Sequence, residues 1–186
     1  MIELQGLPMT AKKPAKAKQS MQPAKSDQVD IFRAAWAKEL PDLDTEAIEI
    51  IARARRITLA LRPGIEAIFA AHGLDAGEFD VIGTLLRSGA PYRLRPTELF
   101  RSLMVSSGGL TDRLVRLEKS GLIRRLAAPG DGRSLLVELT QRGRRVAEET
   151  FRADMAYETR VVSALTAPER RRLAGLLRKL ALSIGA

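Results

Sequence analysis

Two neighbouring stretches decide the fold: residues 94–125, LRPTELFRSLMVSSGGLTDRLVRLEKSGLIRR, and residues 129–143, PGDGRSLLVELTQRG. The first stretch predicts two short helices, over 95–103 and 106–119, with a tight turn between them. Pro96 stands in the first turn of the earlier helix, where its missing backbone N–H leaves no hydrogen bond unmade. A helix, a tight turn and a second helix follow each other in this way in a helix-turn-helix unit.

The second of these helices has an apolar face and a polar face. Leu110, Leu114 and Leu117 recur at helical spacing, so we expect them to pack inward. One of the two serines that open the helix can cap it, and the Gly108-Gly109 pair fits either a close approach of backbone to DNA or a frayed helix start. The polar side chains suit a recognition helix, whose start approaches bases and phosphates. They are Ser106, Ser107, Thr111, Arg113 and Arg116.

A β-hairpin is predicted directly after the helices. Runs 122–126 and 134–139 are β-like, and the segment between them, AAPGDGR, consists largely of turn residues. Arg124 lies on the first strand and Arg133 in the turn, where it can enter a minor groove because the negative potential is high there. Asp131 can hold Arg133 in place through a charge-assisted hydrogen bond.

The formal charge of +9 is distributed unevenly along the chain. Residues 87–145 carry 13 basic and 5 acidic side chains and hence a net charge of +8. Residues 27–86 carry −5, residues 1–26 carry +4 and residues 146–186 carry +2. Charge alone is also explained by a solvated basic face, but together with the helix-turn-helix pattern it predicts double-stranded DNA as a partner.

The rest of the chain is predicted to be helical, apart from its start. Residues 1–26 are rich in Lys, Ala and Pro, which predicts a disordered tail without the apolar core of a secretory signal. Three interpretations of this tail stay open: a transit peptide, an arm that touches DNA phosphates, or a tail without a role. Pro63 predicts a kink or a break in the longest helical pattern. The patterns cover residues 27–40, 45–71, 75–87, 140–164 and 166–184. Asp27 and Thr140 can cap the helices that they precede, and Thr166 with Glu169 forms a capping box.

Composition and motifs exclude several kinds of site. The chain has no Cys and one His, which excludes a disulfide scaffold, a Cys nucleophile and a zinc site built from several Cys or His ligands. The single His72 is expected to end a helix. No Walker loop, G-x-S-x-G or dinucleotide fingerprint occurs, so we expect neither an enzyme nor a cofactor or metal. Since no run of about 18 apolar residues occurs, we expect no membrane partner and a cytoplasmic location.

These stretches resemble the MarR family of winged helix-turn-helix transcriptional regulators. The resemblance rests on the RLEKSGLI phrase, the D-x-R-S wing tip and the LT-x-x-G entry to the next helix, and it covers roughly residues 45–185. It implies a mainly α fold with a small β-hairpin wing, in which a winged helix-turn-helix lobe accompanies a helical dimerisation domain. It further implies a homodimer that places one recognition helix of each subunit in a major groove of a pseudo-palindromic operator, with Arg133 at the wing tip.

Two positions depart from the family pattern. Arg95 stands where family members often have a Thr or Ser cap, so the start of that helix is expected to be weaker. Asp112 stands where Asn is common, and an acid facing phosphate would be repelled. We therefore expect Asp112 to pair with Arg116 at i+4 spacing.

A narrower resemblance concerns a ligand. The additional N-terminal helix with Trp36, together with Asp80 and Arg113, is similar to the urate-responsive branch of the family, in which such groups surround a purine. The resemblance implies that Asp80 and Arg113 form a charge-paired latch and that a small anion competes for the Arg. Two other interpretations stay open: Trp36 is an aromatic that docks its helix, and Asp80 forms a structural ion pair. Phenolic acids and other carboxylates also stay open as effectors.

The sequence thus predicts a dimeric, ligand-responsive repressor that a small aromatic or anionic molecule releases from its operator. A nonspecific or architectural DNA-binding protein is the alternative. The predicted organisation is a tail over 1–26, N-terminal helices for dimerisation and ligand binding over 27–74, a DNA-binding lobe over 75–139 and C-terminal dimerisation helices over 140–186.

Overall fold

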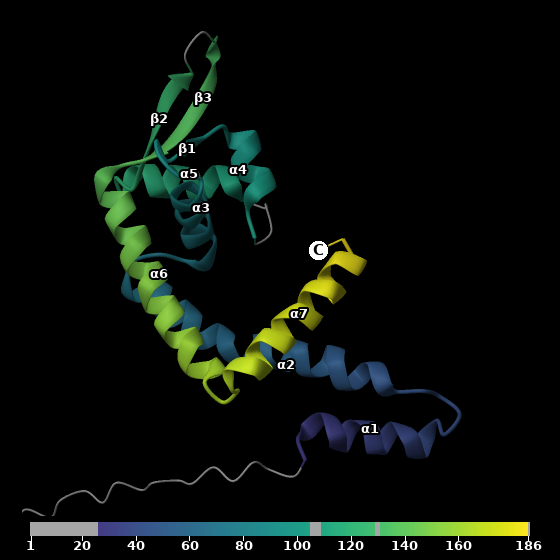
Figure 1. Cartoon of the computed structure of the whole chain (residues 1–186). Coiled ribbons are helices and arrows are strands. Elements are labelled where there is room, and N and C mark those ends of the chain that lie inside the picture. The colour runs from purple at the N-terminus through teal and green to yellow at the C-terminus, as the bar shows by residue number, and fades with distance from the viewer. Residues whose placement is uncertain (1–25, 105–108, 129–130, 186) are drawn as a thin grey trace, which may run out of the picture. The chain divides into compact units, whose positions relative to one another are not determined.

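A computed structural model describes residues 26–104, 109–128 and 131–185 (Figure 1). The chain is mostly helical and carries one three-stranded antiparallel sheet, in the order β1-β3-β2. This architecture confirms the predicted fold class. In chain order the elements are α1 Gln28–Glu39, α2 Glu46–Ala71, α3 Ala76–Arg87, β1 Arg93–Leu94, α4 Pro96–Ser102, α5 Leu110–Lys119, β2 Ile123–Ala128, β3 Asp131–Leu139, α6 Gln141–Val162 and α7 Ala167–Ser183.

Backbone packing divides the chain into two compact units, Met1–Arg56 and Ile57–Ala186. In the first unit, Asp27 caps α1 as predicted, because its carboxylate accepts the backbone N–H groups of Val29 and Asp30. The same carboxylate accepts a hydrogen bond from Arg53 Nε of α2 at 2.8 Å, and Arg53 also pairs with Asp30. An arginine that joins two acids at the start of α1 therefore fastens this helix to α2.

Helix α2 runs through Pro63 without a break, so the helix is one element and not two. The neighbouring Gly64 explains part of this tolerance. A Cβ at Gly64 would overlap the ring of Tyr157 from α6, so glycine lets this ring lie directly against the helix backbone. Packing of this kind offsets the single hydrogen bond that a proline removes from a helix interior.

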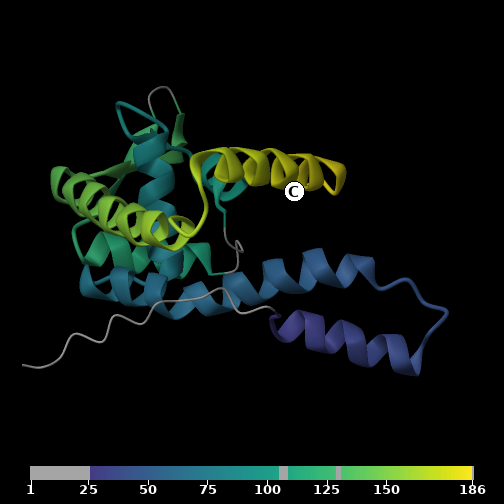
Figure 2. The same ribbon diagram turned by 60° about the horizontal axis from the view of Figure 1, so that its bottom comes forward.

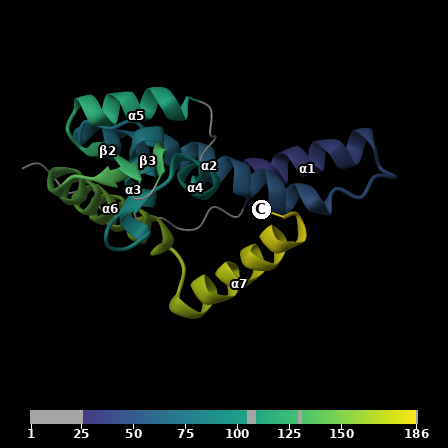
Figure 3. The ribbon, with the colours of Figure 1, turned by 90° about the horizontal axis from the view of Figure 1, so that it is seen from above.

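The core of the second unit lies where α3 packs against both α5 and α6, with the sheet beside them (Figure 3). Phe69 of α2 stacks on Phe79 of α3, with ring centroids 4.3 Å apart. The fully enclosed apolar side chains come from α3, α4, α5, the sheet and α6. They include Val81, Ile82, Leu85, Leu99, Leu117, Ile123, Val137 and Ala147.

The entry to α6 joins the sheet tightly to that helix. Thr140 caps α6 as predicted, because its hydroxyl accepts the N–H of Gly143 at 3.0 Å and donates to the carbonyl of Gly121 at 2.7 Å. A Cβ at Gly143 would lie 2.8 Å from the carbonyl carbon of Leu122. Because only glycine fits against this backbone, the hairpin and α6 are coupled through direct main-chain contact.

Helix α7 follows α6 after a short turn (Figure 2). It begins at the predicted capping box, in which Glu169 Oε2 accepts the backbone N–H of Thr166 at 2.7 Å. The large apolar side chains of α7 and of its C-cap, Ile184, are exposed; those within the helix are Leu173, Leu176, Leu177, Leu180 and Leu182. Within the ranges described, no helix combines the length and apolar character that crossing a membrane requires.

Candidate nucleic-acid interface and ligand hollow

Helix α5, the expected recognition helix, begins later than the sequence predicts. Its N-cap is Gly109, whose φ of 75° lies in the left-handed region, and its first residue is Leu110. A side chain at a left-handed position is strained, so glycine belongs to the helix boundary and not to a helix interior. The predicted start at 106 and the predicted serine cap are therefore wrong. Ser106 and Ser107 themselves lie outside the described residues.

The two faces of α5 are divided as predicted. Leu110, Leu114 and Leu117 are buried against the core, whereas Thr111 and Arg116 are exposed. Thr111 lines a groove between α4 and α5 together with the exposed Phe100 and other residues of α4. The helix therefore keeps its apolar side in the protein and leaves a polar edge for a partner.

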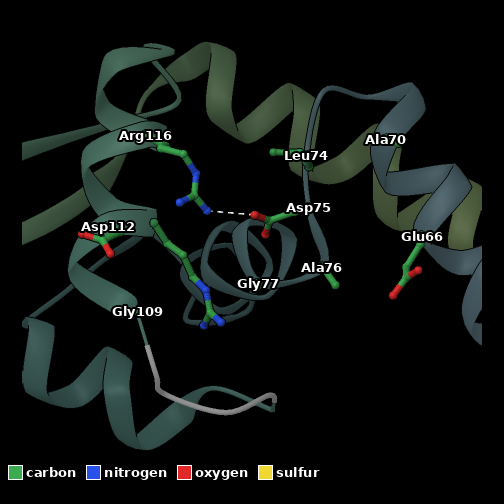
Figure 4. Close-up of a pocket in the computed structure, with 10 residues that line it drawn as sticks. Glu66, Ala70, Leu74, Asp75, Ala76, Gly77, Gly109, Asp112 and Arg116 are labelled. Carbon is green, nitrogen blue, oxygen red and sulfur yellow. Dashed lines mark hydrogen bonds and ion pairs between the residues drawn. The ribbon is translucent and has the colours of Figure 1, made fainter.

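Arg116 is held by two acids of α3, a contact that the sequence did not predict. Its Nη2 lies 2.8 Å from Asp75 Oδ2, and its Nε donates to Glu78 Oε1 at 2.7 Å. The hydrogen bond that Arg116 donates to Glu78 raises the pKa of Arg116 above its ordinary value. Figure 4 shows Arg116 and Asp75 facing each other. The expected pair between Asp112 and Arg116 is wrong, because the acids at the start of α3 lie on the side to which Arg116 points.

Arg113, on the preceding turn of α5, lies against the first turn of α3. A Cβ at Gly77 would overlap its guanidinium, so the absence of a side chain at this position makes room for it. An open hollow of about 640 Å³ adjoins both arginines. It is lined by Glu66, Ala70, Leu74, Asp75, Ala76, Gly77, Gly109, Asp112, Arg113 and Arg116 (Figure 4). The lining carries three carboxyl groups and two guanidinium groups, so a small anion can use these guanidinium groups and the backbone N–H groups at the helix start only by displacing the acids that pair with Arg116.

Asp80 lies three residues after Gly77 on α3, so Arg113 reaches the helical turn that carries it. Only 8% of Asp80 is exposed, and its Oδ2 accepts the backbone N–H of Met104 at 2.9 Å. Asp80 lines a second hollow on α3, not the one beside Arg113. Trp36, the third predicted ligand residue, belongs to the first compact unit, on α1, and is half exposed.

The wing is longer than predicted. Strand β2 extends to Ala128 and pairs there with Asp131, so β3 begins at Asp131 and not at Ser134. Arg133 consequently lies in β3 and not in the turn, and the side chains of Asp131 and Arg133 are outside the described set. The side chain of Arg124 is 60% exposed and pairs across the strands with Glu138 at 3.1 Å. A short strand, β1, also pairs with β3. The sequence did not predict this strand, because two residues are too few to show the alternation of apolar and polar side chains.

The sequence contained a signal for the acids that hold Arg116. Asp75 and Glu78 form a capping box, in which each side chain accepts the backbone N–H of the other. The D-x-x-E spacing therefore predicts the helix start. Their second role depends on the packing of α5 against α3, which no local pattern encodes.

Known proteins resemble this chain in sequence and in fold. Residues 72–134 match the MarR family. The transcriptional regulator PecS of Dickeya dadantii is 34% identical over 142 residues, which make up 76% of this chain and 86% of that protein. A MarR family protein of Mycobacterium tuberculosis, Rv2887, was solved in complex with salicylic acid and is 32% identical, with a TM-score of 0.57 over 76% of this chain and 99% of that one. Sco5413 of Streptomyces coelicolor, a MarR family transcriptional regulator, is 25% identical with a TM-score of 0.63 over 76% of this chain and 97% of that one. The chain is therefore a member of the MarR family of winged-helix, DNA-binding transcriptional regulators.

Proposed function

We propose that this protein is a dimeric repressor that a small aromatic or anionic molecule releases from a pseudo-palindromic operator. In each subunit α5 would enter a major groove, with Thr111, Arg113 and Arg116 near bases and phosphates. Arg124 and Arg133 of the wing would follow the adjacent minor groove. The exposed leucines of α7 favour self-association, because a second copy can cover them.

The observation that carries this proposal is the double contact of α5 with α3. Arg116 pairs with two acids at the start of α3, and Arg113 lies on Gly77 beside the same hollow. An anion in the hollow would compete with these acids for the guanidinium groups. Such a ligand would change the orientation of the DNA-contacting helix and shift the population away from the DNA-binding arrangement.

Urate is the effector we favour, with salicylate and other aromatic acids as the alternatives. The predicted trio of Trp36, Asp80 and Arg113 supports a planar anion, since an indole offers a flat surface and an N–H donor. The complexes of the M. tuberculosis relative with salicylic acid and with p-aminosalicylic acid support an aromatic acid.

DNA binding is tested with duplex sites selected by the full chain from a random library. Affinity is measured by fluorescence anisotropy between 50 and 200 mM salt, and it should fall by roughly 10³-fold or more if six or more phosphates are contacted. Arg116→Ala and Arg133→Ala should weaken binding. The control Arg171→Ala removes the same charge from an exposed position on α7 and should bind as the wild type does. Salt-independent binding would contradict the proposal.

The effector is tested by thermal shift with urate and salicylate, followed by operator release with whichever molecule stabilises the protein. Trp36→Phe and Asp80→Asn should blunt the release while DNA binding without the effector persists. If both variants respond as the wild type does, the effector site lies elsewhere.

A nonspecific or architectural DNA-binding protein is the second candidate, supported by the Lys-rich segment 1–26. Competition with unrelated duplex DNA separates the two. A specific regulator should prefer its selected site by roughly 10³-fold or more, whereas an architectural protein should show little preference.

A further inference from the structure

A second hollow, between α3 and α6, has a chemistry unlike that of the hollow beside Arg113. It encloses about 480 Å³, within the range of small-molecule sites. Its walls are mainly apolar and aromatic, with four charged side chains among them. The lining residues are Phe79, Asp80, Gly83, Leu86, Arg87, Met104, Phe151, Asp154, Met155 and Glu158.

Asp154 is the unusual member of this lining. Only 7% of it is exposed, and its buried Oδ1 accepts no hydrogen bond. Burial raises the pKa of Asp154 above its ordinary value, because desolvation disfavours the charged form. Leaving such an acceptor buried without a donor is unfavourable, so a ligand that supplies a donor would stabilise it. Neither the DNA-binding face nor the hollow beside Arg113 uses this carboxyl group.

A second acid reinforces the first. Glu158 lies one helical turn after Asp154 on α6, and both line the hollow. Burial, and then the charge of Asp154, raises the pKa of Glu158. Like charges at this spacing repel, so the pair favours a positive group between them.

The other charges of the hollow leave it acidic. From α3, Asp80 accepts the N–H of Met104, while the guanidinium of Arg87 donates to the carbonyl of Ser102. The lining therefore carries three carboxyl groups and one guanidinium, which is itself held by a backbone acceptor. A small anion would meet net repulsion here, and a cation would meet attraction.

We propose that the hollow between α3 and α6 binds an organic cation: an ammonium or amidinium group on an aromatic or branched apolar body. The charged group would donate hydrogen bonds to Asp154 Oδ1 and to Glu158. The apolar body would lie on Phe79, Phe151 and Met155, which line the same space. This hollow differs from the one beside Arg113 in its lining and in its charge preference, and Asp80, which is also one of the proposed effector residues, lines it.

Three probes with one body separate charge from shape: 2-phenylethylamine, 2-phenylethanol and phenylacetate. Binding to the full chain without DNA is measured by calorimetry and thermal shift at neutral pH. We expect the amine to bind at least tenfold more tightly than the alcohol, and phenylacetate not to bind. Equal binding of the three probes, or tighter binding of phenylacetate, would overturn the proposal.

Matched variants test the two acids. Asp154→Asn, which keeps the size of the side chain, should lose at least tenfold in amine affinity. Glu149→Gln removes an exposed acid from the same helix and should bind the amine as the wild type does. If Asp154→Asn does not fold, Glu158→Gln serves in its place and should weaken amine binding several-fold. Unchanged affinity in the folded acid variants would refute the site.

The pH dependence gives an independent measurement. Amine affinity should rise with pH as Asp154 and Glu158, whose pKa values burial raises, lose their protons, with Asp80 and Arg87 as the other charges that face the amine. A flat profile would contradict the assignment. These assays contain no DNA. If the amine does not bind, the proposed operator binding is not contradicted, and if the protein does not bind an operator, the amine measurements still test the hollow.

Discussion

The substitution Gly77→Ala tests whether Arg113 is positioned by the first turn of α3. A Cβ at residue 77 would lie 2.5 Å from Cζ and 2.9 Å from Nη2 of Arg113. Ordinary van der Waals contact begins near 3.4 Å, so the guanidinium must move by about 1 Å or more. The obstacle is the far end of a flexible side chain, which can rotate away without moving any backbone.

The expected effect on stability is therefore small. Alanine is favoured over glycine in a helix by about 0.4–1 kcal/mol, partly because it restricts the unfolded chain. Displacing Arg113 from its contacts offsets this gain, so the free energy of unfolding should stay within about 1 kcal/mol of the wild type. Gly143→Ala provides the contrast. There a Cβ would lie 2.8 Å from the backbone carbonyl carbon of Leu122, and the cost should reach about 3 kcal/mol or more.

Urea denaturation of both variants measures these free energies, and fluorescence anisotropy measures DNA affinity. Gly77→Ala should remain folded while its DNA affinity or its effector response changes toward that of Arg113→Ala. The reasoning is refuted if Gly77→Ala unfolds as readily as Gly143→Ala. It is equally refuted if Arg113→Ala alters DNA binding and effector response while Gly77→Ala alters neither.

Three further predictions concern charge. Arg116→Gln should weaken DNA binding and reduce the slope of log affinity against log salt by about one unit, because one phosphate contact is lost. The hydrogen bond from Arg53 lowers the pKa of Asp27 from 3.8 to about 2, so Asp27 stabilises α1 above pH 3.8 and this contribution is lost as the pH falls toward 2. An acid titration followed by circular dichroism should show this loss in the wild type and not in Asp27→Asn, which retains a capping side chain. Asp154 has a raised pKa and the opposite sign: its ionisation destabilises the fold as the pH rises above 3.8. Urea denaturation measures the free energy of unfolding of Asp154→Asn and of the wild type. The variant's gain in this free energy over the wild type should therefore be larger at pH 7 than at pH 4.

Much of the fold follows from local patterns in the sequence. Asp27 opens α1, Asp75 opens α3 and Thr140 opens α6, as the capping residues predict. The buried face of α5 follows from its leucine spacing. These features depend on residues within one helical turn of each other, which is the range over which sequence periodicity carries information.

The failures occur where tertiary contacts override local preference. Of the kink and the break that Pro63 predicts, α2 excludes only the break, and α5 begins after Gly109 and not at Ser106. The start of β3 at Asp131 depends on pairing with Ala128 across the hairpin. Arg116 matched a recognition helix by spacing, but its acidic partners come from α3, far away in sequence. No pattern within α5 could have revealed them.

Under the proposed function, the contact between α5 and α3 makes DNA and an anionic effector oppose each other. Arg116 cannot hold a phosphate with the same N–H groups that it donates to Asp75 and Glu78. Because the side chains of Arg116 and Asp75 are about half exposed, their ion pair orients the guanidinium without fixing it, and an anion in the hollow can replace Asp75 as its partner. Linkage then demands reciprocity: operator DNA must weaken effector binding by the same factor by which the effector weakens DNA binding. Calorimetric titration of the effector into free and DNA-bound protein measures that factor. Equal effector affinity in both titrations would show that the hollow does not control DNA binding.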